Sequence, residues 1–532
     1  MSYQQQPYGQ SPYGQPQQYQ QNGYGGQQQY YQQPQPQVYQ QPQPQVYQQT
    51  APPNYQNQNN LQPKKEDRFK STQYKDGWAI ALWFICLLGF TGINYLRTST
   101  SSSSGSASSN TNSGTSGTTN QVDIPTGEII GVLVTSAVAG FLLSMFYFFL
   151  MQRYDYQSNK RFAGTLIKVT LIIAIVVNFA IAALFFIIGQ FVGGIVMLVV
   201  ACLVAWAYWS WRFRIPFAKV ILKTVTSITK QFPGTLVAGV TGLIVQVIFI
   251  GWWVVTAVGI AKLSNDKVIS GGTTYGLFIF TIFFFYWNSQ VIGNAVHITV
   301  AGVFATFYFQ GIPNAGGGVT VSVQNPTSAS AKRALTTGFG PNCYGSLLIA
   351  IIQTLKFIVN SARKNDGGDN IVLQIILCCI ACILNIFQDL LEYFNKYAFA
   401  QVAIYGKDYC TAAKDTWELA KSRGIDAVIN DNLIGNVLGM GCLFIGLITA
   451  GIAVLYVKLS PAIPNETGAF FIMGVAGLFI GVVEFSVLSG VIDSGVTTTF
   501  VCLAEDPQAL LNTKPNLFNK IREVYPQVLL GF

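Results

Sequence analysis

Charged residues are scarce in this sequence. Of its 532 residues, 10% are Asp, Glu, Lys or Arg, whereas 50% are hydrophobic and 14% are aromatic. A soluble protein has about 25% charged residues, so this chain has too few to cover a water-exposed surface of its size. Lipid must replace water over much of that surface, which predicts an integral membrane protein.

Histidine is almost absent as well, since His297 is the single example. A four-ligand zinc site needs several His or Cys side chains, and the CxxC pair Cys379 and Cys382 lies inside an apolar run. The glycine-rich stretches at residues 316–318 and 367–368 lack the Lys-Ser/Thr that completes a phosphate-binding loop. We therefore expect no metal, no cofactor and no catalytic residue, and we predict that the protein is not an enzyme.

Two further classes are excluded by how the charges and cysteines are distributed. The formal net charge is +9, but the basic residues are scattered between apolar runs and do not line one face, so nucleic acid is not expected as a partner. The nine cysteines are odd in number and lie mostly in apolar stretches, so no disulfide framework is expected. The polar amino terminus argues against a cleavable signal peptide.

Residues 1–62 contain no charged residue and consist almost wholly of Gln, Tyr, Pro, Gly and Asn. The octapeptide QPQPQVYQ occurs at residues 33–40 and again at residues 41–48. Such a segment buries too little apolar area to offset its chain entropy, so we expect it to be disordered. Its role stays open between a passive tail and a clustering or partner-docking segment.

The remaining sequence contains about ten apolar runs, each close to the length of about 20 residues that a helix needs to cross a bilayer. The predicted fold is therefore all-α, a polytopic integral membrane protein with about ten transmembrane helices behind a disordered amino-terminal tail. The ten runs are residues 78–96, 129–151, 166–189, 191–211, 234–261, 275–309, 345–358, 371–387, 433–457 and 469–492. The predicted domains are a cytosolic tail at 1–70, a transmembrane domain at 71–505 with a Ser/Thr-rich outer loop at 97–125, and a cytosolic tail at 506–532.

The distribution of Lys and Arg orients these helices. With the amino terminus in the cytosol, roughly three quarters of the basic residues fall on the inner side, as the positive-inside rule requires. The carboxyl terminus is then cytosolic too. In this orientation Asn465, in the sequon Asn465-Glu466-Thr467, lies in an outer loop and is a candidate glycosylation site.

Two segments alternate basic and apolar residues, at residues 213–232 and 389–410. This spacing is typical of amphipathic helices that lie on the inner leaflet with their lysines at the lipid headgroups. We expect both segments to be structural.

The run at residues 275–309 is too long for one simple span, because 35 helical residues measure about 50 Å and the hydrocarbon core about 30 Å. It must tilt, project into water or break. Polar side chains gather at its centre and must avoid lipid, so they line a wet cavity for solute or tie helices together. These side chains are Asn288, Gln290, Asn294 and His297.

Large aromatic residues lie near this centre, namely Trp252 and Trp253 in the fifth run and Tyr286 and Trp287 in the sixth. If the four rings converge, they form a site in which an organic cation is held by cation–π attraction. Packing between helices is the alternative role for such rings.

Ionisable residues inside a span are candidates for function. Glu484 lies in the middle of the tenth run and Asp493 near its inner end, while Asp389 and Glu392 flank the eighth. We predict Glu484 and Asp493 as the groups for charge or proton coupling. His297 is either a titrating group or a simply hydrogen-bonded one.

Several long motifs resemble the choline transporter-like family and its fungal branch, the pH-nine-sensitive proteins. The likeness covers residues 78 to 532 and leaves the Gln/Tyr-rich tail outside. The motifs are NAVHITVAGVFATFYF at 294–309, EYFNKYAFAQVAIYGKDYCTAAKDTWEL at 392–419, DSGVTTTFVCLAEDP at 493–507, RGIDAVINDNLI at 423–434 and RIPFAKVILK at 214–223.

The resemblance implies about ten transmembrane helices, residence in the plasma membrane and transport of a solute, which in animal members is choline or a related amine. We therefore predict a transporter of a small organic cation of the choline type, working by alternating access. Its expected partners are that small-molecule solute and the lipid bilayer, and its oligomeric state is left open. The alternative is a membrane scaffold or sensor that does not transport and that works through its disordered tail.

Overall fold

The computed structural model separates the chain into two units, Met1–Gln62 and Pro63–Phe532, and all of the residues that it describes belong to the second unit. The described residues are 68–69, 73–104, 126–153, 191–211, 215–265, 269–313, 319–365, 371–423, 426–460 and 467–524, with scattered positions between 168 and 189. Asn465 lies outside the described residues, and so does the segment 1–62.

The described part is helical except for one short antiparallel hairpin, in which β1 (Gly311–Pro313) pairs with β2 (Val319–Val321). The helices up to the hairpin are α1 (Gly77–Ser104), α2 (Thr126–Arg153), α4 (Phe191–Trp211), α5 (Ile215–Gln231), α6 (Gly234–Asn265) and α7 (Gly271–Gln310). The helices after it are α8 (Pro326–Leu335), α9 (Phe339–Asn365), α10 (Ile371–Tyr405), α11 (Tyr409–Arg423), α12 (Asp426–Leu459), α13 (Thr467–Glu505), α14 (Pro507–Thr513) and α15 (Pro515–Val524).

Eight of the described helices are long and apolar enough to cross a membrane. Their candidate spans are Gly77–Asn94, Gly131–Phe149, Gly234–Ser264, Gly271–Gln310, Phe339–Lys364, Val372–Tyr405, Leu433–Leu459 and Phe470–Glu505. The helix α4 occupies the predicted run 191–211, whereas the structure describes only scattered positions of the predicted run 166–189. The count of ten spans therefore stays a prediction.

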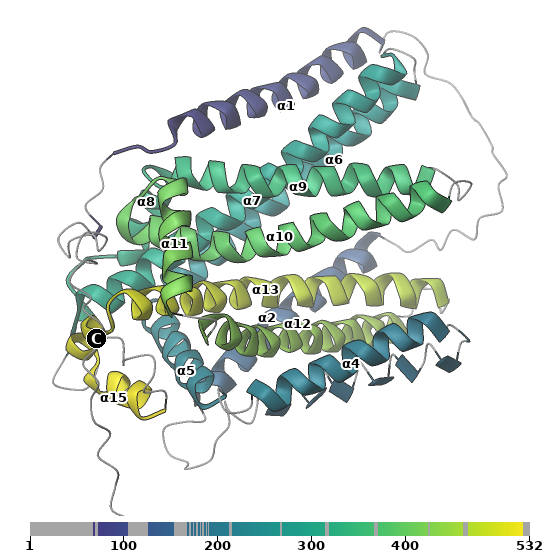
Figure 1. Ribbon diagram of the computed structural model, residues 1–532. Helices are drawn as coiled ribbons and strands as arrows, with labels where there is room; N and C mark the ends of the chain where they lie inside the picture. The colour runs from purple at the N-terminus through teal and green to yellow at the C-terminus, as the bar shows by residue number, and fades with distance from the viewer. Residues whose placement is uncertain are drawn as a thin grey trace, which may run out of the picture. The chain divides into compact units, whose positions relative to one another are not determined.

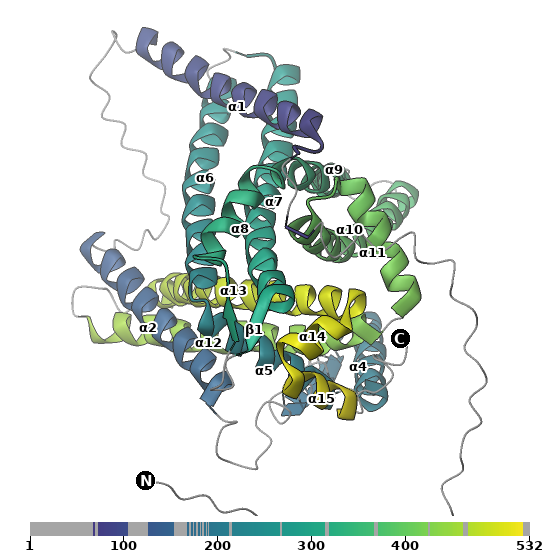
Figure 2. The same cartoon turned by 90° about the vertical axis from the view of Figure 1, so that its left-hand side faces the viewer.

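The long sixth run forms the single helix α7, which continues for 40 residues without a break. Of the three outcomes predicted for this run, breaking is therefore wrong. The excess length is accommodated inside the protein, because every residue from His297 to Tyr308 is buried. Figure 2 shows α7 beside α6, with α9 and α10 on the other side.

The predicted seventh and eighth runs, 345–358 and 371–387, are both too short. They belong to the longer helices α9 and α10. The predicted surface helix at 389–410 is also wrong, since α10 runs through to Tyr405 and buries Phe399 and Ile404 in the largest core cluster. Charged residues near Glu392 end the apolar run in the sequence without ending the helix, because their partners are supplied by neighbouring helices.

The amphipathic helix predicted at 213–232 is confirmed as α5. Its apolar face includes Ile221 and Val225, which are fully buried, while Lys223 and Lys230 are exposed. That face packs against α13, α12 and α2, so protein covers it where we expected lipid.

Two groups of helices can be distinguished by their contacts. The first group is α1, α6, α7, α9 and α10, and the second is α2, α5, α12 and α13 (Figure 1). The helix α13 joins the groups by packing against α7, α6 and α10. Within the second group α12 and α13 approach closely, because a Cβ added at Gly477 would lie 2.7 Å from Cβ of Ala453.

The largest core cluster lies where α7, α10 and α13 end, close to α5, α8 and α14. We call this end of the helices the basic end, because several buried or half-buried cations lie there. They are Arg68, Arg333, Lys396, Lys407 and Lys514. The opposite end, where α10 and α13 begin, is called the far end.

Candidate functional site

The four predicted aromatic residues lie in two separate clusters. Trp287 is fully buried beside Ala79 and Leu347, and its Nε1 donates a hydrogen bond of 2.9 Å to the carbonyl of Cys343. Trp252 and Trp253 pack in a second cluster, which is built on phenylalanine rings. There the ring centroid of Trp252 lies 4.9 Å from that of Phe90, and Nε1 of Trp253 donates to the carbonyl of Thr281. The structure thus uses these tryptophans for packing between α1, α6, α7 and α9.

The predicted amides of α7 are sheltered. Asn288 is buried, and Gln290 and Asn294 are half-buried. The amide of Asn294 donates to the hydroxyl of Ser346 on α9 at 3.0 Å, and Asn342 of α9 donates to the carbonyl of Val291 at 2.9 Å. These contacts tie α7 to α9, and they satisfy polar groups that would otherwise be costly at membrane depth.

His297 joins three helices. Its Nε2 lies 2.9 Å from the carbonyl oxygen of Lys396 on α10, and its Nδ1 lies 2.8 Å from the hydroxyl of Ser494 on α13. Because a carbonyl only accepts, Nε2 must carry a proton. The single histidine therefore fixes the crossing of α7, α10 and α13.

An ion pair lies directly beside this histidine. The ammonium of Lys396 is 2.7 Å from Oδ2 of Asp493, and the two side chains are 41% and 26% exposed. The pair joins α10 to α13, so the predicted coupling residue Asp493 is brought close to His297 through Lys396 and through its neighbour Ser494. A cationic solute that reached Asp493 would compete with the ammonium of Lys396.

Glu484, the other predicted coupling residue, lies apart from this junction. Its Oε2 is buried against Gly140 of α2 and makes no hydrogen bond to any residue that the structure describes. A Cβ at position 140 would lie 2.2 Å from Oε2, so glycine there allows the carboxyl to approach α2 this closely. The hydroxyls of Ser136 and Ser144, one turn away on either side of Gly140, are likewise buried without a partner among the described residues.

A polar cavity of about 310 Å³ lies between α7, α9 and α10. Tyr286 is the one predicted site residue that lines it. The other lining residues are Gln353, Lys356, Phe357, Asn360, Ser361, Lys364 and Gln388. The helix α9 supplies most of them from one face, which the sequence did not reveal because the predicted seventh run ended at residue 358.

The cavity wall is organised by a chain of polar contacts. The ammonium of Lys356 donates to Gln388 at 2.6 Å, and the amide of Gln388 donates to Glu392 at 2.7 Å. Gln353 donates to the same carboxylate at 3.4 Å. The carboxylate of Glu392 is therefore bound by Gln388 and Gln353 and does not line the cavity, whereas Lys356 and Lys364 line it with positive charge.

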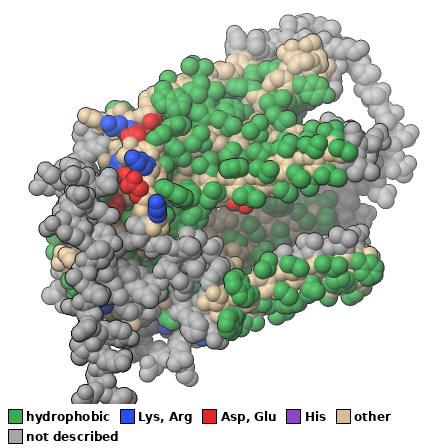
Figure 3. Space-filling model, viewed as in Figure 1, with side chains coloured by type: hydrophobic (Ala, Val, Ile, Leu, Met, Phe, Trp, Pro, Cys, Tyr) green, Lys and Arg blue, Asp and Glu red, His purple; other side chains and the backbone are tan. Residues whose placement is uncertain are grey.

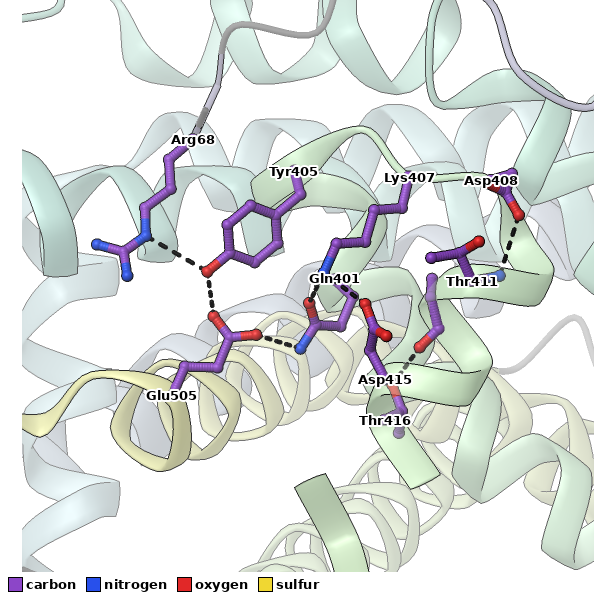
Figure 4. A network of polar contacts seen from close by, with 10 residues as sticks. Arg68, Gln401, Tyr405, Lys407, Asp408, Thr411, Asp415, Thr416 and Glu505 are labelled. Carbon is purple, nitrogen blue, oxygen red and sulfur yellow. Dashed lines mark hydrogen bonds and ion pairs between the residues drawn. The ribbon is translucent and has the colours of Figure 1, made fainter. Parts of the chain in front are cut away.

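The basic end is closed by a polar network that the sequence alone did not reveal (Figure 4). Glu505, the last residue of α13, accepts hydrogen bonds from Gln401 and Tyr405 of α10. Lys407 donates to Gln401 at 3.3 Å and pairs with Asp415 of α11 at 2.6 Å. These residues lie in two of the motifs quoted above, 392–419 and 493–507, and that location is the one sequence signal that could have found them.

Arg68, far away in the sequence, completes this network. Its guanidinium lies 3.3 Å from the hydroxyl of Tyr405 and 3.3 Å from a carboxylate oxygen of Asp506. Burial by itself would lower the pKa of Arg68, but the hydrogen bond to Tyr405 and the charge of Asp506 raise it above its usual value. The cation is thus permanent, and it links the end of α10 to the start of α14.

The space-filling view shows a hollow below α10, with an acidic side chain at its edge (Figure 3). The contacts between α10 and α13 made by Lys396, Gln401 and Tyr405 all lie in the last third of α10. The two helices are therefore fastened together at the basic end.

Among the described residues, no three His, Cys, Asp or Glu side chains gather into a metal site.

The motifs that contribute the network lie in a region that matches a known protein family. Residues 195–508 match the family model described as plasma-membrane choline transporter. The chain belongs to the choline transporter-like family. That family model covers α5 to α13, and so it includes His297, the pair of Lys396 and Asp493, and Glu505.

Curated fungal members of the family align over most of the chain. Protein PNS1 of Cryptococcus neoformans var. neoformans serotype D is 36% identical over 382 residues, which are 70% of this chain and 69% of that protein. Protein PNS1 of Gibberella zeae is 35% identical over 478 residues, which are 87% of this chain and 85% of that protein. Protein PNS1 of Candida albicans is 35% identical over 374 residues, or 67% and 71% of the two chains. The resemblance to the fungal pH-nine-sensitive branch is confirmed.

Family membership and the apolar helices together establish a multi-pass membrane protein of a transporter family.

Proposed function

We propose that this protein carries a small organic cation of the choline type across the plasma membrane by alternating access. The match to the plasma-membrane choline transporter family model supports the solute class. The ion pair between Lys396 and Asp493 carries the mechanism, because it joins two helices from different groups at a place where both side chains are partly exposed.

In this mechanism the solute enters from the far end, through the hollow beside α10. The positive-inside rule supports a cytosolic basic end, since the arginines and lysines of the network gather there. Both termini are then cytosolic, and the loop with Asn465 is outside.

The solute cation replaces the ammonium of Lys396 as the partner of Asp493. The two cations compete for one carboxylate, because like charges close together are unfavourable and an unpaired charge at membrane depth is costly. Loss of the pair removes one contact between α10 and α13, and so a solute that enters from the far end and binds Asp493 favours opening of the basic end. Alternating access requires that a ligand interacts differently with the two states of the carrier, and the replaced ion pair provides that difference.

The cavity between α7, α9 and α10 contributes a second polar surface. Tyr286 offers a ring face, whereas Lys356 and Lys364 repel a cation. In this proposal the ammonium group of the solute binds at Asp493. The uncharged or anionic parts of larger solutes bind in the cavity. Glu484 is kept as the group for proton coupling, since its carboxyl has no cation partner among the described residues.

The test measures saturable uptake of labelled choline by purified protein in proteoliposomes. Asp493→Asn should reduce uptake at least about tenfold, because a hydrogen-bonded charge pair is worth about 1.5–3 kcal/mol. Glu523→Gln is the matched control, since Glu523 is an exposed carboxylate on α15 and its loss should change nothing.

Normal uptake by Asp493→Asn would contradict the proposed site. If no amine shows saturable uptake, and deletion of residues 1–62 alone gives the cellular phenotype, the protein is a scaffold or sensor and not a carrier.

A further inference from the structure

Two residues that precede the first helix are inserted among the helix ends at the basic end. The backbone N–H of Phe69 donates a hydrogen bond of 2.9 Å to the carbonyl of Ile404, near the end of α10. Phe69 has a φ of 64°, in the left-handed region that a bulky side chain rarely adopts. Such a conformation persists only where the surroundings hold it, so the contacts of Phe69 are specific.

The side chains of Arg68 and Phe69 make two reciprocal contacts. The guanidinium of Arg68 lies 3.8 Å from the centroid of the Phe309 ring at the end of α7, and the guanidinium of Arg333 on α8 lies 5.1 Å from the Phe69 ring. Cations attract the face of an aromatic ring, and more strongly when water is excluded. The pair 68–69 is thus fixed by two cation–π contacts. The cation of Arg68 lies over a ring of α7, and the ring of Phe69 lies under a cation of α8.

Arg333 depends on this contact. Its Nε and Nη2 are buried and make no hydrogen bond to any residue that the structure describes, and burial lowers its pKa. The ring of Phe69 therefore compensates a charge that is otherwise costly to bury. Behind the ring a void of about 10 Å³ is lined by Ile298, Ala403 and Gly338 among others.

The same two residues also hold α10 to α14. Arg68 contacts Tyr405 of α10 and Asp506, the residue that caps α14. Tyr405 in turn donates to Glu505, the last residue of α13 (Figure 4). Arg68 and Phe69 thereby touch the ends of α7, α8, α10 and α14, at the end where α10 and α13 are fastened together.

We propose that Arg68 and Phe69 form a releasable latch, which keeps the basic end closed and whose release sets how often that end opens. Two residues can leave their contacts together without any helix unfolding. The helices themselves share long interfaces, so they separate less readily. The latch lies six residues after Gln62, the last residue of the Gln/Tyr-rich segment. A partner that holds this segment therefore has a short connection to the latch. The effect on transport rests on the proposed function, but the closure itself does not.

The test uses the full chain with Ala403→Cys as a reporter, because Ala403 is 7% exposed and lines the void behind Phe69. Labelling by a water-soluble maleimide is quantified by mass spectrometry. Trypsin cleaves after Lys396 and Lys407, which isolates the reporter from the native Cys410. The exposed Cys410 serves as the internal standard.

Adding Phe69→Ala or Arg68→Gln should raise labelling of the reporter about fivefold or more, the size expected for a conformational coupling. Tyr74→Ala is the matched control, since Tyr74 is an exposed aromatic residue close by, and it should leave labelling unchanged. Phe69→Leu, which keeps an apolar side chain and loses the ring, should give an intermediate value.

Unchanged labelling in the folded Phe69→Ala and Arg68→Gln variants would overturn the latch. So would failure of both Phe69 variants to fold, because a releasable element cannot be required for folding. Uptake is measured on the same samples. Raised labelling without uptake of any amine leaves the latch standing and removes the transport proposal, whereas unchanged labelling with normal uptake removes the latch alone.

Discussion

The two halves of α10 differ more than any change in their hydropathy suggests. From Val372 to Leu390 the helix exposes large apolar side chains such as Ile375 and Phe387, as a surface in contact with lipid would. From Tyr397 to Tyr405 it is buried, and from Lys396 onward it is fastened to α13 by an ion pair and hydrogen bonds. Because α10 is fastened to α13 only in its last third, while its first half contacts α9, the first half can pivot about the fastened end.

The largest expected effect comes from making one substitution in each half. Phe399→Ala should lower the free energy of unfolding by about 3–5 kcal/mol, because Phe399 is 1% exposed in the largest core cluster and its loss leaves a cavity. Phe387→Ala, with a side chain 58% exposed, should cost less than about 0.5 kcal/mol. Thermal unfolding of both variants in nanodiscs measures the difference, and equal losses would remove the contrast between the halves.

A smaller effect should follow when one hydroxyl is removed from the anchored half. Tyr405→Phe deletes the donor to Glu505 and the acceptor for Arg68, which should cost about 1–3 kcal/mol because both partners are left unpaired in a largely buried place. Tyr275→Phe is the control, since Tyr275 is 73% exposed at the start of α7. The two variants are compared by thermal unfolding, and an unaffected Tyr405→Phe would show that the network of Figure 4 adds no stability.

The smallest effect on stability is expected at Glu484, which lies midway along α13 between the fastened end and the far end. Glu484→Gln should change stability little, since the side chain keeps its shape and loses only a charge that has no cation partner among the described residues. The pH profile of uptake should become flatter, because glutamine cannot bind or release a proton. Uptake assayed across neutral pH decides this, and a profile identical to that of the unmodified protein would exclude coupling through Glu484.

Much of the fold could be predicted because its signal is local. A run of about 20 apolar residues is enough to indicate a membrane helix, and α6, α7, α12 and α13 were found in this way. The ends of α9 and α10 were predicted wrongly for a physical reason. Polar residues such as Asn360 of α9 and Lys396 of α10 interrupt the apolar pattern, yet both helices continue, because Asn360 lines a cavity and Lys396 pairs with Asp493 of another helix.

The candidate site was predictable only as a set of residue types. His297, Glu484 and Asp493 are conspicuous in an apolar sequence, but their partners lie on other helices, so the pattern could not say which of them meet. Arg68 is one of the many basic residues whose distribution orients the helices, and nothing in the sequence near it indicates its contacts with Phe309 and Asp506.

The unbroken course of α7 has a mechanical consequence. Forty helical residues make a stiff rod of about 60 Å. Trp287 anchors it in one packed cluster and Phe304 in another, and Phe309 at its tip supports Arg68. In the proposed transport mechanism, a tilt of α7 at the end where the solute enters would displace its opposite tip, as in a lever.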